Sequence, residues 1–132
     1  LGATWGLKYK TAAFVWAKLN RKQGLVERAA GDDKNWFMGM GYYSRSNCEP
    51  CLLFTRGKPK RKSKGVRQLI VTPIREHSQK PDLIYERIEA LVEGPYLEIF
   101  ARQRRAGWSA IGNGIDGRDI RQVLQPTQLT FL

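Results

Sequence analysis

The sequence has few of the residues on which metal sites and covalent catalysis depend. Its 132 residues include one histidine, His77, and two cysteines, Cys48 and Cys51. A tetrahedral zinc site takes four ligands, so His and Cys alone cannot complete one in this chain. With one histidine and no G-x-S-x-G segment, no Ser-His-Asp triad can be proposed, and there is no phosphate-binding P-loop. We therefore expect no metal and no nucleophilic hydrolase chemistry.

The two cysteines have C-x-x-C spacing, but their surroundings do not favour a redox role. A thioredoxin-like pair is expected at a strand-to-helix turn. Here Pro50 follows a polar stretch and Cys51 opens an apolar run. We expect structural or incidental cysteines in a reducing compartment.

Long apolar segments are also absent. No run approaches the roughly 18 residues that a membrane-spanning helix needs. Residues 1–7 lack the basic-then-apolar layout of a signal peptide. They also lack an initiator Met, so we expect that an upstream segment was removed. The sequence predicts a cytoplasmic protein with no membrane partner.

Acidic residues are scarce relative to basic ones. Lys and Arg number 23 against 12 Asp and Glu, which gives a net charge of +11. Such an excess favours a polyanionic partner, most simply nucleic acid, although a basic surface that only maintains solubility remains an alternative.

Many of the cations are concentrated in one run. Positions 56–67 contain seven cations and no acid. We expect 58–64 to be an exposed loop, because like charges repel and pack poorly. Its candidate phosphate contacts are Lys58, Lys60, Arg61, Lys62 and Lys64. The alternative is a solvated hairpin tip.

The remaining pattern is that of one compact α/β domain. Short apolar runs predict strands over 11–18, 51–56, 68–72, 96–100 and 108–111. Pro81 predicts the start of a helix, since proline is tolerated in the first turn. The apolar face of this helix is formed by Leu83, Ile84, Ile88, Leu91 and Val92. Residues 19–36 are expected to form a loop, and 116–125 a terminal helix or a turn. The order of elements predicts a layered α/β sheet that is incomplete, because one helix cannot cover both faces.

Two strand ends carry residues typical of a nucleotide site. The strand ending at Phe100 leads into Ala101 and Arg102, and the next strand ends at Gly112-Asn113-Gly114. Ligands of open α/β sheets bind at the carboxyl ends of strands, where a polar side chain can hold ribose hydroxyls. The alternative is a buried strand followed by a glycine turn.

A second candidate is the segment 77–81, just before the predicted helix. The unsatisfied amides of a first helical turn favour anions, and Lys80 adds a charged donor. The alternative is an ordinary surface helix start, capped by Ser78 with His77 exposed.

These segments, taken in order, resemble the MT-A70 family of adenine-N6 methyltransferases over about residues 4–117. The matching blocks are Trp5-Gly6-Leu7-Lys8-Tyr9-Lys10, Phe14-Val15-Trp16-Ala17-Lys18, Gly39-Met40-Gly41-Tyr42-Tyr43, Glu49, Leu52-Leu53, Arg56-Gly57, Arg75-Glu76-His77-Ser78-Gln79-Lys80-Pro81, Tyr85, Ile88-Glu89, Leu97-Glu98-Ile99-Phe100-Ala101-Arg102, Gly107-Trp108 and Gly112-Asn113. Each block alone is a weak match, but the ordered set is specific.

The resemblance implies a Rossmann-like methyltransferase sheet with permuted motif order, whose amino-terminal part is missing from this chain. It implies S-adenosylmethionine as the cofactor. The implied cofactor-binding residues are His77, Ser78, Lys80, Phe100, Ala101, Arg102, Asn113 and Gly114. Among them, Lys80 would reach the methionine carboxylate and Asn113 the ribose.

The family's catalytic Asp-Pro-Pro-Trp does not occur in this chain, which has no Pro-Pro pair. We therefore expect the chain to supply the cofactor-binding part of a methyltransferase and to be inactive alone. Two alternatives remain: a noncatalytic nucleic-acid-binding module on a degenerate methyltransferase fold, or one half of a split enzyme completed by a second chain. By resemblance, DNA is favoured over RNA, and a bacterial or phage origin is expected.

Overall fold

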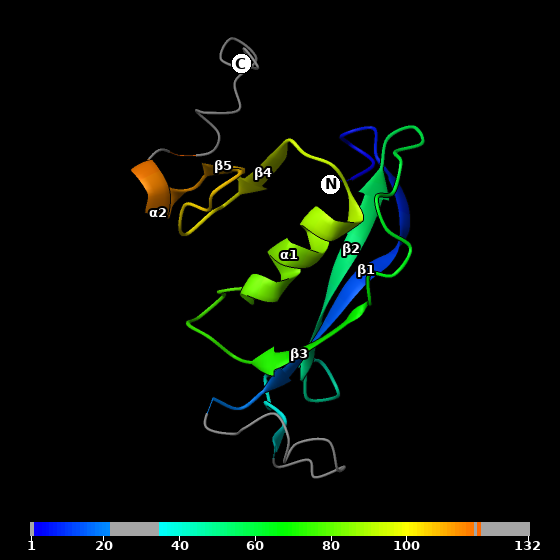
Figure 1. The fold of residues 1–132 in the computed structure, drawn as a ribbon. Coiled ribbons are helices and arrows are strands. Elements are labelled where there is room, and N and C mark those ends of the chain that lie inside the picture. Colours follow the sequence, from blue (N-terminus) through cyan, green and yellow to red (C-terminus); the bar gives the residue numbers. More distant parts are fainter. Residues whose placement is uncertain (1, 22–34, 118, 120–132) are drawn as a thin grey trace. The chain divides into compact units, whose positions relative to one another are not determined.

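A computed structural model of the chain describes residues 2–21, 35–117 and 119 (Figure 1). The chain divides into two units, Leu1–Glu93 and Gly94–Leu132, each with its own sheet. The architecture is mixed α/β, as the sequence predicts. Residues 22–34 of the expected loop, and 118 and 120–125 of the expected terminal helix or turn, lie outside the described residues.

The first unit is built on a three-stranded sheet in the order β2-β1-β3. Its central strand is β1 (Lys8–Leu19), which pairs with β2 (Cys48–Thr55) antiparallel and with β3 (Leu69–Pro73) in parallel. β2 begins at Cys48, earlier than predicted, with Pro50 inside it. Because β2 is an edge strand, the missing N–H of proline is tolerated there.

Helix α1 (Asp82–Leu91) provides the other layer of this unit, as Figure 1 shows. Phe14 and Trp16 alternate along β1 toward the same face and form a buried core with Ile70 of β3. The helix packs Leu83, Ile84, Ile88 and Leu91 against this core, as its periodicity predicts. It ends at Leu91, so Val92, which was predicted on its apolar face, is instead the residue that caps it.

The carboxyl end of α1 is tied to the basic segment. The backbone amide of Lys62 donates to the carbonyl of Leu91 at 2.8 Å, and its Nζ donates to that of Glu89 at 2.9 Å. Nζ also pairs with the carboxylate of Glu93 at 2.9 Å. No basic residue lies in the last turn of α1 itself. Lys62 therefore satisfies terminal carbonyls of the helix and places a cation where its dipole is negative.

The second unit contains a parallel pair of strands, β4 (Tyr96–Ile99) and β5 (Trp108–Ile111), followed by the short helix α2 (Asn113–Asp116). The rings of Tyr96 and Trp108 stack with centroids 4.8 Å apart, across the first pair in the register. β3 and β4, which flank α1 in sequence, belong to different sheets. Neither described helix has the length and apolarity that a bilayer crossing requires.

Candidate functional site

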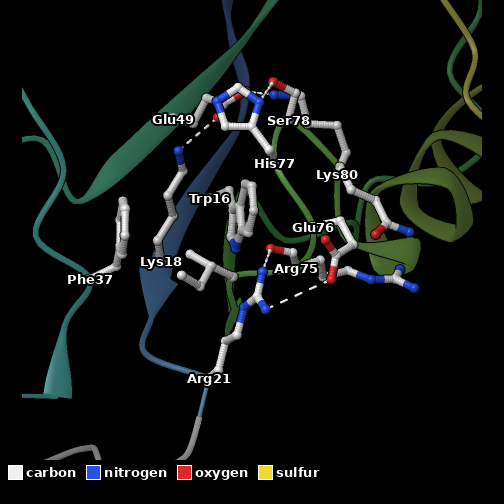
Figure 2. A pocket seen from close by; sticks show the side chains of 12 residues that line it. Trp16, Lys18, Arg21, Phe37, Glu49, Arg75, Glu76, His77, Ser78 and Lys80 are labelled. Atoms are coloured by element: carbon white, nitrogen blue, oxygen red, sulfur yellow. Dashed lines mark hydrogen bonds and ion pairs between the residues drawn. The ribbon is translucent and has the colours of Figure 1, made fainter.

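A cavity of about 430 Å³ opens in the first unit beside β1 and β2 (Figure 2). Its volume lies in the range of small-molecule sites. It is lined by Trp16, Lys18, Arg21, Phe37, Glu49, Ile74, Arg75, Glu76, His77, Ser78, Gln79 and Lys80. Three of the predicted cofactor residues, His77, Ser78 and Lys80, therefore lie on one wall of the same cavity.

Glu49 of β2 joins two lysines at this cavity. Its Oε2 lies 2.9 Å from Nζ of Lys18, and its Oε1 accepts a hydrogen bond from Nζ of Lys80. Partial burial raises the pKa of Glu49, but hydrogen bonds from Lys80 and then Lys18, reinforced by their charges, outweigh burial and hold that pKa below its ordinary value. Two ammonium groups thus share one carboxylate, and the trio carries a net positive charge that suits an anionic ligand.

Aromatic rings fix the position of Lys18. Its Nζ lies 5.0 Å from the ring centroid of Trp16 and 5.9 Å from that of Phe37. Figure 2 shows the lysine side chain between these two rings. Both distances are within the range of cation–π attraction. Trp16 is itself held by Nε1 donating to the carbonyl of Thr72 at 3.2 Å.

The segment preceding α1 is tightly turned. Ser78 has φ of +62°, in the left-handed region that non-glycine residues rarely adopt. Its Oγ lies 3.0 Å from Nδ1 of His77, and the amide of Gln79 donates to the carbonyl of Glu76 at 2.9 Å. Ser78 is not the cap of α1, because Pro81 occupies that position without a side-chain hydrogen bond. Unusual backbone conformations of this kind concentrate at ligand sites.

Two arginines form the rim of the cavity. Nη2 of Arg21 donates to the carbonyl of Arg75 at 2.8 Å, and its Nη1 lies 3.7 Å from the carboxylate of Glu76. Arg75 in turn pairs with Asp82 at 2.5 Å, in the first turn of α1. The rim is therefore linked to the start of the helix.

Both cysteines are free and lie in β2. Burial, and after it the charge of Glu49, raises the pKa of the Cys51 thiol. A thiol that stays protonated is a poor nucleophile. That the two cysteines are structural or incidental stays a prediction. Among the described residues, no three His, Cys, Asp or Glu side chains gather as a metal site.

The second unit brings the other predicted residues to one edge. β4 and β5 run in parallel with Ile99 opposite Ile111, so the residues after both strands emerge side by side. Phe100 leaves β4 with φ of +65° and is 72% exposed. Asn113 begins α2 and is exposed. These strand ends are where the nucleotide site is predicted, and binding there stays a prediction.

Ala101 and Gly112 pack directly against each other at that edge. Ala101 is buried, and its amide donates to the carbonyl of Ile111 at 2.9 Å. A Cβ at Gly112 would lie 2.1 Å from the carbonyl oxygen of Ala101. The side chain of Ala101 is thus part of the interior, whereas those of Arg102 and Asn113 face solvent. That both units contribute to a single cofactor pocket stays a prediction.

The basic segment 58–64 is largely exposed. Within it Lys62 differs from the others, because it is bonded to the end of α1 and to Glu93. The four remaining cations, Lys58, Lys60, Arg61 and Lys64, have exposed side chains.

Sequence reasoning did not identify Lys18 or Glu49 as site residues, although both lie in the blocks that carry the family resemblance. A signal was present in β1, because Trp16 and Lys18 are two residues apart on a strand and so face the same side. Glu49 could not be identified in the same way. It comes near Lys18 because Trp16 lies opposite Glu49 in the β1–β2 ladder, and the sequence alone does not give this register.

Comparison with known proteins gives consistent matches. The model of the MT-A70 family matches residues 3–114. The Type II methyltransferase M.MunI of Mycoplasma sp is 32% identical over 115 residues, which are 85% of this chain and 42% of that protein. The N(6)-adenosine-methyltransferase MT-A70-like protein of Arabidopsis thaliana is 29% identical over 116 residues, 86% of this chain and 16% of that protein. The N(6)-adenosine-methyltransferase catalytic subunit METTL3 of Homo sapiens is 29% identical over 117 residues, 86% of this chain and 18% of that protein. The chain therefore spans less than half the length of each.

Proposed function

Because the chain belongs to the MT-A70 family, we propose that it supplies the cofactor-binding part of an enzyme that transfers a methyl group from S-adenosylmethionine to the N6 amine of adenine in nucleic acid. The names of the relatives support this activity, since they include N(6)-adenosine methyltransferases and a Type II methyltransferase. We further propose a single methyltransferase domain with a Rossmann-like sheet in permuted order, of which these residues are a part.

The observation that carries this proposal is the strand-end arrangement in the second unit. Parallel β4 and β5 present Phe100, Arg102 and Asn113 together at their carboxyl ends. This is the edge at which open α/β sheets bind nucleotide-like ligands. The family match covers both this edge and the cavity around Lys80.

The residues present fit S-adenosylmethionine. The side-chain carboxamide of Asn113 can both accept hydrogen bonds from ribose hydroxyls and donate hydrogen bonds to them. Lys80 and Lys18 share one carboxylate, so positive charge remains for the carboxylate of a methionine moiety. Phe100 offers an exposed ring to the cofactor, and the backbone of Ala101 and Arg102 follows it, with Gly114 next to Arg102. His77 and Ser78 shape the end of the pocket near Lys80.

S-adenosylmethionine supplies, when bound, the electrophilic methyl group. The role of Lys18 is to hold Glu49, which in turn holds Lys80 at the cavity. The adenine amine is a poor nucleophile, because its lone pair is delocalised into the ring. The Asp and Pro of Asp-Pro-Pro-Trp would accept its hydrogens, and no such segment occurs in these 132 residues. We therefore expect the chain alone to transfer no methyl group, and a further segment or a second chain to complete the enzyme.

The net charge and the exposed segment 58–64 support nucleic acid as the substrate. DNA is favoured over RNA by the family resemblance alone. The same features would support a noncatalytic binding module on a degenerate fold. The two functions differ in one requirement. A methyltransferase must bind S-adenosylmethionine through the proposed cofactor residues, whereas a noncatalytic module need not.

Calorimetric titration of S-adenosylmethionine into site variants tests the proposal. Asn113→Ala and Lys80→Ala should each weaken binding by about tenfold, the effect of removing one good hydrogen bond or charge interaction. Lys10→Ala, which removes an exposed lysine of β1, is the matched control and should bind as the wild type does. Equal affinity in all variants would contradict the assigned site.

A further inference from the structure

Segment 36–47 exposes an unusual amount of apolar surface. Met40 and Tyr42 are each 90% exposed and Tyr43 is 98% exposed, with Met38 at 68%. Large apolar side chains gathered in one exposed segment commonly mark an interaction site. Binding of the cofactor at Lys80 and Asn113 does not require them.

Both ends of this segment form backbone hydrogen bonds with the same residue, Lys18 of β1. The amide of Phe37 donates to the carbonyl of Lys18 at 2.9 Å, and the amide of Lys18 donates to the carbonyl of Asn47 at 2.8 Å. Further along, the amide of Gly39 donates to the carbonyl of Ser46 at 2.9 Å. The segment is therefore a closed loop anchored on β1 beside the Lys18–Glu49 pair.

The tip of the loop is sterically restricted. A Cβ at Gly41 would lie 2.1 Å from the carbonyl oxygen of Ser44, and one at Gly39 would lie 2.8 Å from that of Ser46. Tyr43 has φ of +67°, in the left-handed region. Backbone strain at a non-glycine residue is characteristic of ligand-contacting segments. The turn thus presents Tyr42 and Tyr43 outward, and their rings meet edge to face with centroids 4.7 Å apart.

The base of the loop connects to the candidate site. A hollow of about 190 Å³ is lined by Trp36, Phe37, Met38, Arg45 and Asn47. Phe37 also lines the larger cavity, where Figure 2 shows its ring facing Lys18. Because Phe37 lines both hollows, the base of the loop lies next to the cavity that contains Lys80.

We propose that segment 36–47 is a stacking platform for unpaired nucleotides of a single-stranded or locally opened nucleic acid, next to the site of methyl transfer. This inference rests on the proposed function and specifies the form of its substrate. The segment contains Arg45 and no acid, and the chain carries +11, so a polyanion is favoured over a basic or neutral partner. Exposed aromatic rings beside cations bind single strands because every base has a face on which a ring can stack. An enzyme that modifies a base also needs that base outside the duplex.

The test measures binding of a fluorescent single-stranded DNA and of the same strand with abasic positions, at fixed salt. The wild type should bind the intact strand more tightly than the abasic one. Tyr42→Ala/Tyr43→Ala should weaken binding of the intact strand by about tenfold or more and remove the preference for it, because the rings on which bases stack are gone. Tyr42→Phe/Tyr43→Phe keeps both rings and should bind as the wild type does. Tyr9→Ala, which removes an exposed tyrosine of β1 outside segment 36–47, is the matched control.

Retention of the abasic discrimination by the double alanine variant would overturn the proposal. So would sedimentation that shows self-association in the wild type and its disappearance in that variant, since the aromatic surface would then bind a second copy of the chain. Circular dichroism establishes that each variant is folded. Titration with S-adenosylmethionine separates the two levels: failure of stacking with cofactor binding intact contradicts only the platform, whereas no cofactor binding by the wild type contradicts the proposed function.

Discussion

Gly112 is in direct contact with the backbone of Ala101. A Cβ at position 112 would lie 2.1 Å from the carbonyl oxygen of Ala101 and 2.6 Å from its amide nitrogen. This contact joins the segment after β4 to the segment after β5, and it sets where Phe100 and Asn113 emerge. The integrity of the proposed cofactor edge therefore depends on the absence of a side chain at position 112.

Gly112→Ala should destabilise the protein by about 1–3 kcal/mol, the usual cost of overpacking, because backbone atoms of Ala101 would have to move. Urea unfolding measures the change. Gly114→Ala is the control, since a Cβ there would meet its nearest atom, the carbonyl oxygen of Arg102, at 3.4 Å. Gly114→Ala should change the free energy of unfolding little, because no close contact is made and alanine favours the helix more than glycine does. Equal stability of the two variants would contradict the close packing of Gly112 on Ala101.

Glu49 should make stability dependent on acid pH. Its pKa is lower in the folded protein than in the unfolded chain, because the hydrogen bonds and charges of Lys80 and Lys18 outweigh burial. The carboxylate therefore contributes stability above the ordinary glutamate pKa, and this contribution is lost as pH falls through the lowered pKa. Glu49→Gln should reduce stability at neutral pH and converge with the wild type in acid. Thermal melts across this range measure the effect. Glu86→Gln, on the exposed side of α1, is the control, and the difference between its stability and that of the wild type should not depend on pH in this way.

The elements of the fold could be predicted from local patterns, but their pairing could not. Apolar runs predict each strand, and the spacing from Leu83 to Leu91 predicts α1. The early start of β2 was missed because Pro50 argues against a strand until its edge position is known. Similarly, β3, α1 and β4 follow one another in sequence, yet the two strands belong to different sheets. Sheet membership depends on long-range contacts that no local pattern encodes.

The basic segment should divide into two classes of cation. Replacing Lys58, Lys60 and Lys64 together with Ala should weaken nucleic-acid binding and reduce the salt slope, log K against log salt concentration, by about 0.9 for each duplex phosphate that is no longer neutralised. Lys62→Ala should leave that slope nearly unchanged, because Lys62 is bonded to Glu89 and Glu93. It should instead lower stability by about 1 kcal/mol, since the bonds of Nζ to Glu89 and Glu93 are removed while the backbone bond to Leu91 stays. Fluorescence anisotropy over a salt series measures the slope. An equal reduction of the salt slope in both variants would contradict this prediction, because Lys62 would then neutralise phosphates as the other cations do despite its intramolecular bonds.

The candidate site shows the same division between local and long-range information. Cations at 58–64, Lys80 before a helix and Asn113 after a strand could each be found in the sequence, because their positions relative to elements are local. Lys18 and Glu49 could not, since they meet through the antiparallel register of β1 and β2. Lys62 was grouped with the phosphate contacts because its bond to α1 spans 27 residues. Charge alone does not distinguish a cation that caps a helix from one that faces solvent.

The most direct test of the central claim is calorimetric titration of S-adenosylmethionine into the unmodified 132-residue chain. We predict saturable binding at a single site. This is because both groups of proposed cofactor residues, at Lys80 and at Phe100 to Asn113, are present in the chain. Absence of binding by a chain that is folded by circular dichroism would contradict the claim that these residues form the cofactor-binding part of a methyltransferase.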